Sequence, residues 1–158
     1  KGILSSHLHS EGKHAEELSL IGPSTNRWVP EIIKANDPED ISYYPYMNGQ
    51  FVFKNAVIRF EQVILEGLKK NNLSPEDIDL LIPHQANLRI SQFVQRKFGL
   101  KDDQVYNNIE KYGNTTAASI PIALTEAWES GKIKSGDNIV LAAFGSGFTW
   151  GSVIINWQ

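Results

Sequence analysis

The sequence contains one apolar run that stops abruptly on polar side chains, Leu80-Leu81-Ile82-Pro83-His84-Gln85-Ala86-Asn87. From Ile78 to Ile82 the residues are almost continuously apolar, which is typical of a strand buried on both faces. Polar groups just beyond the carboxyl end of such a strand are where α/β proteins usually collect their chemistry. The run therefore predicts an α/β fold and makes His84 a candidate site residue.

Helical patterns lie on both sides of this strand. Before it, four apolar residues recur at the spacing of one helix face and predict a helix over residues 50–70. These residues are Phe53, Val57, Phe60 and Ile64. A capping-box pattern, Ser74-Pro75-Glu76-Asp77, then begins a short turn of helix. After the strand, residues 86–98 are expected to form a second helix that ends at Gly99.

The remaining elements follow from the same kinds of pattern. The other expected strands are residues 2–9, 105–109, 138–144 and 150–157. A third helix is expected over residues 115–130, with local distortion at its start because Pro121 lies there. Residues 145–147 turn the chain into a hairpin. The alternation predicts helices on both faces of a mostly parallel sheet, with the last strand antiparallel at its edge.

Length and composition limit the class of protein. The 158 residues fit one compact domain, and 41% hydrophobic with 21% charged residues is ordinary for a globular protein. The net charge of -3 argues against a general nucleic-acid binder. The sequence shows no apolar stretch long enough to span a membrane and no signal peptide. It has no cysteine, which excludes a disulfide framework and a thiolate metal site and favours a cytoplasmic location.

The chain opens directly on an apparent strand, and its only methionine is Met47. A domain more often begins with a loose lead-in before its first ordered element. We therefore expect the chain to be a fragment, or a domain, of a longer protein.

Two more segments accompany the strand end at Pro83-His84-Gln85-Ala86-Asn87. The first, Tyr112-Gly113-Asn114-Thr115-Thr116-Ala117-Ala118-Ser119, places an asparagine before small residues that open a helix. The second is the glycine-rich Ala143-Phe144-Gly145-Ser146-Gly147-Phe148-Thr149-Trp150-Gly151. In this order the three motifs resemble the C-terminal half of β-ketoacyl-acyl-carrier-protein synthase III, a condensing enzyme of the thiolase fold. The opening residues 5–12 also resemble the strand that closes that family's N-terminal half.

The resemblance implies a division of the chain into three parts. Residues 1–12 would be the last strand of an N-terminal half, or a lead-in, and residues 13–48 an irregular excursion. Residues 49–158 would be the C-terminal thiolase-like domain, an α/β unit with a mostly parallel sheet, an antiparallel edge strand and helices on both faces. The catalytic cysteine of the family would lie outside this chain, so the chain alone should not turn over.

The resemblance also implies an acyltransferase that condenses an acyl-CoA primer with malonyl-acyl-carrier protein in the initiation of fatty-acid synthesis. The intact enzyme would be a cytoplasmic homodimer that needs no metal and no cofactor beyond its pantetheine-borne thioesters. Such a condensation requires stabilisation of the enolate that forms on decarboxylation. An imidazole N–H from His84 and an amide N–H from Asn114 are neutral donors that suit this role.

Further site residues are implied residue by residue. The backbone amide of Ser146 would donate to the acyl-thioester oxygen. Gly49 and Asn87 fall at positions where the family contacts the pantetheine arm. The acyl carrier protein is acidic, so its docking site should be basic. The basic residues at the family's docking positions are Lys54, Arg89 and Arg96.

Each feature taken alone has a simpler explanation. His84 could be a structural histidine, Asn114 a turn or N-cap residue, and the glycine-rich segment a plain hairpin connector. The basic residues could form a solvated face, while His7 and His9 have no nearby third ligand in sequence for a metal site. Two other functions also fit. One is a secondary-metabolism relative that transfers acyl groups or primes polyketides, and the other is a non-catalytic subunit that binds acyl carrier protein.

Overall fold

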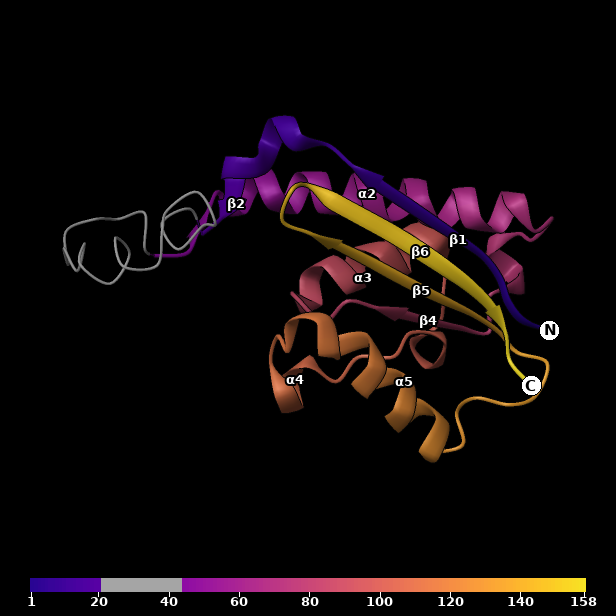
Figure 1. Ribbon diagram of the computed structural model, residues 1–158. Helices are drawn as coiled ribbons and strands as arrows, with labels where there is room; N and C mark the ends of the chain where they lie inside the picture. The colour runs from indigo at the N-terminus through magenta and orange to yellow at the C-terminus, as the bar shows by residue number, and fades with distance from the viewer. Residues whose placement is uncertain (21–43) are drawn as a thin grey trace, which may run out of the picture.

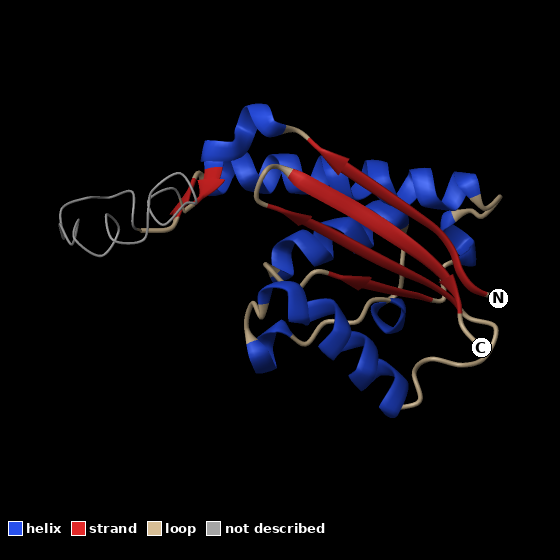
Figure 2. Cartoon of the chain, viewed as in Figure 1, coloured by secondary structure: helices blue, strands red, loops and turns tan. Residues whose placement is uncertain are grey.

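The computed structural model describes residues 1–20 and 44–158, and Figure 1 shows their arrangement as helices packed on a twisted sheet. The strands are β1 (Gly2–Ser10), β2 (Leu18–Ser19), β3 (Tyr46–Met47), β4 (Leu80–Pro83), β5 (Asn138–Gly145) and β6 (Thr149–Asn156). The α-helices are α2 (Gly49–Lys70), α3 (Leu88–Phe98), α4 (Ile109–Tyr112) and α5 (Ser119–Glu129). Short 3-10 helices join them: η1 (Gly12–Glu17), η3 (Pro75–Asp77), η4 (Asp102–Gln104) and η5 (Thr116–Ala118). Figure 2 shows the same elements by type.

The main sheet is mixed, with the strand order β1-β6-β5-β4. β4 and β5 are parallel, whereas β6 is antiparallel to β5 on one side and to β1 on the other. The α/β class and the helices on both faces are confirmed, but the expected mostly parallel sheet with an antiparallel edge strand is wrong. The tight turn after β5 forces β6 to run back beside it. Because β1 then pairs with the free side of β6, the antiparallel strand lies inside the sheet.

β1 belongs to the same sheet as the rest of the chain. It pairs with β6 from Gly2 opposite Asn156 to Ser10 opposite Thr149, with one bulge between Ile3 and Ser5. The assignment of residues 1–12 to the last strand of an N-terminal half, or to a lead-in, stays a prediction. The predicted excursion at 13–48 falls largely on residues 21–43, which lie outside the described residues, and its described ends form η1 and the β2–β3 ribbon.

The strand expected at 105–109 does not form. Only Val105 makes a bridge to Leu81, and Tyr106 donates its backbone N–H to the Leu81 carbonyl at 2.9 Å. The buried amide of Gln85 then donates to the Tyr106 carbonyl at 3.2 Å and accepts the Asn108 N–H at 3.0 Å. A side chain thus satisfies the backbone groups that a neighbouring strand would have bonded, and the chain leaves the sheet.

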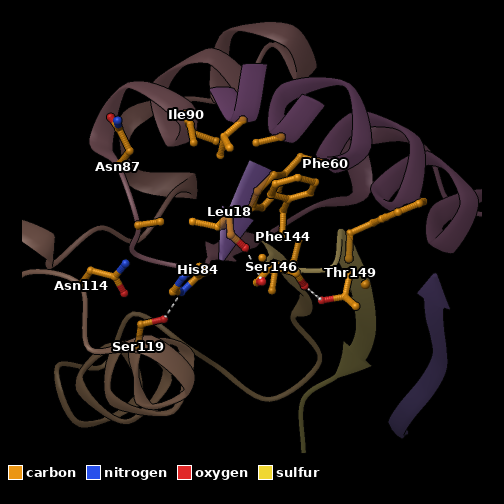
Figure 3. Close-up of a pocket in the computed structure, with 18 of the residues that line it drawn as sticks. Leu18, Phe60, His84, Asn87, Ile90, Asn114, Ser119, Phe144, Ser146 and Thr149 are labelled. Carbon is orange, nitrogen blue, oxygen red and sulfur yellow. Dashed lines mark hydrogen bonds between the residues drawn. The ribbon is translucent and has the colours of Figure 1, made fainter. Parts of the chain in front are cut away.

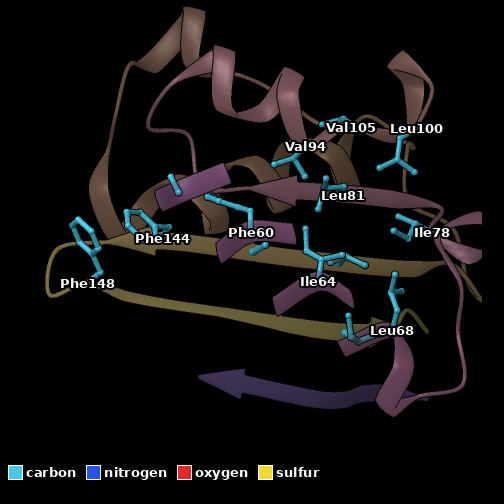
Figure 4. Packing of buried hydrophobic residues seen from close by; sticks show 14 of the residues in the cluster. Phe60, Ile64, Leu68, Ile78, Leu81, Val94, Leu100, Val105, Phe144 and Phe148 are labelled. Atoms are coloured by element: carbon cyan, nitrogen blue, oxygen red, sulfur yellow. The ribbon is translucent and has the colours of Figure 1, made fainter. Parts of the chain in front are cut away.

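The sheet lies between two layers of helix, because alternate residues of its strands face opposite sides. On one face α2 and α3 cover the larger core cluster, which Figure 4 shows around Phe60, Ile64 and Leu81. On the other face α5 places Ala123 and Ala127 against a smaller cluster on β4 and β5. This second face is covered only in part. The β1 side chains of Ile3 and Leu8 are 71% and 80% exposed, so the sheet retains an apolar face without cover from the described residues.

Helix ends follow local chemistry. α3 begins at Leu88 rather than 86, because the Asn87 side chain caps it by accepting the Arg89 N–H at 2.9 Å. It ends at Gly99, whose φ of 67° is left-handed, as expected. The third helix begins at Ser119 rather than 115, after the 3-10 turn η5. Pro121 therefore sits in the first turn, where its missing N–H costs no helical hydrogen bond.

Within residues 1–20 and 44–158, no helix is both long and apolar enough to cross a membrane. His7 and His9 both bond to one carboxylate, that of Glu66, at 3.2 and 2.6 Å. Across the same residues, no group of three or more His, Asp or Glu side chains is arranged to hold a metal ion.

Candidate active site

His84 is the first residue beyond the carboxyl end of β4. Its backbone N–H donates to the Ala142 carbonyl of β5 at 2.8 Å, which fixes the start of the side chain against the sheet. The ring is half-buried, and its Nδ1 lies 2.6 Å from the hydroxyl oxygen of Ser119. Burial lowers the pKa of His84 below its ordinary value, because a charged ring would lose hydration. The lowered pKa favours the neutral imidazole, which has one N–H to offer.

Asn114 lies in the exposed loop between α4 and η5. Its side-chain oxygen accepts the backbone N–H of Thr116 at 2.9 Å, so the turn role expected for asparagine is realised. Thr116 has a φ of 51°, which is uncommon for a β-branched residue and marks a locally constrained turn. Because the oxygen is engaged, the side-chain amide has its two N–H groups left as donors.

The loop that carries Asn114 is anchored through Glu126 of α5. This carboxylate accepts from the Asn108 side chain and from Lys111, both at 2.7 Å, and from the Tyr112 hydroxyl. These donors lower the pKa of Glu126 to about 2, with the Asn108 hydrogen bond as the largest cause. One carboxylate therefore ties α4 to α5 just before the chain reaches Asn114.

The glycine-rich turn connects β5 to β6. The Ser146 hydroxyl donates to the Leu18 carbonyl at 2.5 Å, and Thr149 donates to the Ser146 carbonyl at 2.8 Å. Ser146 is not among the described residues with a positive φ, whereas Gly147 has a φ of 132°. Serine at the middle position is thus compatible with the backbone of this turn.

These segments surround one cavity of about 1480 Å³ (Figure 3). In Figure 3 the His84 ring stands between Asn114 and Ser146, with the bond to Ser119 on the side away from the helices α2 and α3. The volume exceeds the roughly 300–1,000 Å³ of most ligand pockets because the cavity continues over the uncovered strands β1 and β6. The cavity is thus open along the strands β1 and β6.

The structure brings most of the predicted site residues together. The members that line the cavity are His84, Asn114, Ser146, Gly49, Asn87 and Arg89. Lys54 on α2 and Arg96 on α3 are exposed and lie outside the cavity wall. The roles of all eight residues remain predictions.

Sequence reasoning missed the residues that hold the pair in place. Ser119 bonds His84, Thr116 bonds Asn114, and Gln85 is 3% exposed with its amide fully engaged between β4 and residues 106–108. Ser119 and Thr116 stand inside the Asn114 motif and Gln85 inside the His84 motif. Their places in the two motifs indicated that they lie near His84 and Asn114. Their hydrogen-bond partners could not be predicted, because these depend on the tertiary fold.

Comparison with known proteins identifies the family. A model described as 3-oxoacyl-[acyl-carrier-protein (ACP)] synthase III C terminal matches residues 68–157, a range that includes His84, Asn114 and Ser146. Beta-ketoacyl-[acyl-carrier-protein] synthase III of Clostridioides difficile (strain 630) is 46% identical over 157 residues, or 99% of this chain and 46% of the relative. The enzyme of the same name from Rhodospirillum centenum is 44% identical over 158 residues, or 99% of this chain and 45% of the relative.

Solved structures agree with these matches. The crystal structure of 3-oxoacyl-[acyl-carrier-protein] synthase III from Aquifex aeolicus VF5 is similar with a TM-score of 0.84 at 40% identity, covering 99% of this chain and 44% of that one. The synthase III from Pseudomonas aeruginosa PAO1 gives a TM-score of 0.86 at 35% identity, covering 99% and 46%. The chain thus spans a little under half the length of these relatives. Because the family model matches more than half of the chain, the chain belongs to the 3-oxoacyl-[acyl-carrier-protein] synthase III family and corresponds to its C-terminal domain.

Proposed function

We propose that this domain supplies the decarboxylation half of the active site in an enzyme that condenses an acyl-CoA primer with malonyl-acyl-carrier protein. The observation that carries the proposal is that the half-buried ring of His84 and the amide of Asn114, whose oxygen accepts the Thr116 N–H, line the same cavity. Burial lowers the pKa of His84, which favours the neutral ring. Two uncharged donors aimed at one oxygen stabilise developing negative charge without any proton transfer.

The chemistry assigned to the pair is the loss of CO₂ from a malonyl thioester. The bond between the carboxylate carbon and the methylene carbon breaks, and its electron pair forms an enolate whose charge rests on the thioester oxygen. N–H groups of His84 and Asn114 donate to that oxygen. Losing one such donor typically slows a reaction by about 10²–10³-fold. The enolate carbon then attacks the acyl group held on the enzyme.

The acylation step needs a nucleophile that this chain does not contain, since it has no cysteine. The cysteine would come from the N-terminal half, at the open wall of the cavity. The Ser146 amide, held in a turn pinned by its own hydroxyl and by Thr149, would share the acyl-thioester oxygen with the amide of that cysteine. Neither step requires a metal or an organic cofactor.

Substrate delivery is proposed for the rim of the cavity. Gly49 and Asn87 would contact the pantetheine arm, and the side-chain N–H groups of Asn87 remain available because its oxygen caps α3. Exposed Lys54, Arg89 and Arg96 would attract the acidic acyl carrier protein to this rim on an otherwise net-acidic chain. The intact protein would work as a homodimer in the cytoplasm.

The test uses the intact enzyme, with this chain joined to its cysteine-bearing half. His84→Ala should slow malonyl decarboxylation by about 10²–10³-fold and leave acylation of the cysteine by acyl-CoA largely intact. The control is His7→Ala. His7 lies on β1, the edge strand farthest from β4, and its imidazole bonds Glu66 of α2, so its loss should leave both steps near wild type.

CO₂ release and the mass of the acylated protein report the two steps separately. Equal loss of both steps in His84→Ala would overturn the assigned role. Wild-type enzyme that accepts a longer or branched primer but not acetyl-CoA would move the protein toward the secondary-metabolism relatives.

A further inference from the structure

The hydroxyl of Ser119 lies between two groups at the end of β4. Its oxygen is 2.6 Å from Nδ1 of His84 and 3.3 Å from the backbone nitrogen of Gln85. Ser119 is the first residue of α5 and is only 2% exposed, so water does not compete for this hydroxyl. Among the described residues, these two are the hydrogen-bond partners that the structure gives it.

The hydrogen of this hydroxyl has one acceptor among its two neighbours. The Gln85 N–H can only donate, so the Ser119 oxygen accepts from it. The hydroxyl hydrogen then needs an acceptor, and Nδ1 of a neutral imidazole is the acceptor within reach. A neutral imidazole with an unprotonated Nδ1 carries its hydrogen on Nε2. The opposite tautomer would leave the buried hydroxyl hydrogen without an acceptor, which is costly away from water.

We infer that Ser119 is a positioning residue that holds His84 in the tautomer with its hydrogen on Nε2. The inference rests on the proposed function, because only a donor on the cavity side of the ring stabilises the enolate oxygen. The other tautomer would direct a lone pair at that oxygen and repel it. Since the His84 backbone is already fixed by Ala142, the Ser119 hydroxyl is the group that decides where the ring hydrogen lies.

Nitrogen-15 NMR of histidine-labelled intact enzyme tests the tautomer directly. The His84 signals are assigned by their loss in His84→Ala. Wild type should show a protonated Nε2 and an unprotonated Nδ1, and Ser119→Ala should show a mixture of both tautomers. The matched control is Ser91→Ala, which removes another buried helix hydroxyl, 2.6 Å from Asn107 and away from His84. It should keep the wild-type pattern.

Kinetics give a second, independent readout. Ser119→Ala should lower kcat for malonyl decarboxylation by about 3- to 10-fold, the effect of one net hydrogen bond, with little change in KM or in cysteine acylation. Ser91→Ala should change none of these. A single Nε2–H tautomer that persists in Ser119→Ala, or a decarboxylation rate equal to that of Ser91→Ala, would overturn the inference.

The two proposals fail in different ways. If His84→Ala slows decarboxylation as proposed but Ser119→Ala does not slow it, only the role of Ser119 is refuted. If wild-type enzyme does not decarboxylate malonyl thioesters, the proposed function is refuted, and the NMR comparison still decides whether Ser119 sets the tautomer.

Discussion

Asn114 offers a way to separate the structural work of a side chain from its chemistry. Its oxygen holds the Thr116 N–H at 2.9 Å, while its nitrogen is the proposed enolate donor. Asn114→Asp keeps an oxygen for the first task and removes the donor for the second. Asn114→Ala removes both. The pair of variants therefore tests the two roles independently.

The two variants should differ in their free energy of unfolding, whereas both should lose decarboxylation rate. Asn114→Ala should lower the free energy of unfolding by about 0.5–1.5 kcal/mol through the lost bond to Thr116, whereas Asn114→Asp should stay near wild type. Both should slow decarboxylation, Ala by about 10²–10³-fold, which corresponds to about 2.7–4 kcal/mol of activation free energy. Asp should be at least as slow, because an exposed aspartate is ionised at pH 7 and repels the enolate.

The assay combines thermal unfolding of the intact enzyme with CO₂ release from a malonyl thioester. Asn114→Asp should melt close to wild type and decarboxylate no faster than Asn114→Ala. Asn114→Asp with near wild-type decarboxylation would refute the donor role. A lower melting temperature for Asp than for Ala would refute the assigned bond to Thr116.

Two predictions concern stability. The pKa of Glu126 is about 2 instead of 4.5, so its carboxylate stabilises the fold above pH 4.5, and this contribution disappears as the pH falls toward 2. Glu126→Gln should therefore melt below wild type at pH 7, with the difference shrinking between pH 4.5 and 2; a constant difference in melting scans would contradict this. Gly67→Ala gains about 1 kcal/mol of helix propensity, but its Cβ would lie 2.9 Å from two carbons of the buried Ile154, and overpacking costs about 1–3 kcal/mol. A net loss of about 1 kcal/mol should lower the melting temperature by a few degrees, and adding Ile154→Val should relieve only part of it, because valine lacks Cδ1 but keeps Cγ1; an unchanged or higher melting temperature for Gly67→Ala would refute the clash.

Most elements of the fold were predictable from local pattern. The apolar run before His84, the helix face of residues 53–64 and the glycine at 99 each act within one element, so sequence spacing captures them. Strand pairing was not predictable in this way. Nothing local in β1 or β6 says that the two are neighbours, and the same residues would fit an edge strand elsewhere.

In the candidate site, too, local pattern was predictable from the sequence and tertiary contacts were not. His84 and Asn114 could be found because each stands out within its own motif, and both line one cavity in the structure. Ser119 and Gln85 could not be assigned roles from the sequence, because a serine at a helix start and a glutamine after a strand are ordinary there. Only the packing of α5 against the end of β4 brings the Ser119 hydroxyl to the ring.

The pairing of β1 with β6 has a consequence for how the protein is made. β1 is synthesised well before β6, yet Gly2 ends opposite Asn156. Contacts of such long sequence separation form slowly, since the loop between them must first be closed. During synthesis β1 must therefore wait for β6, and its apolar side chains Ile3 and Leu8, which α5 does not cover even in the folded domain, stay exposed in the meantime.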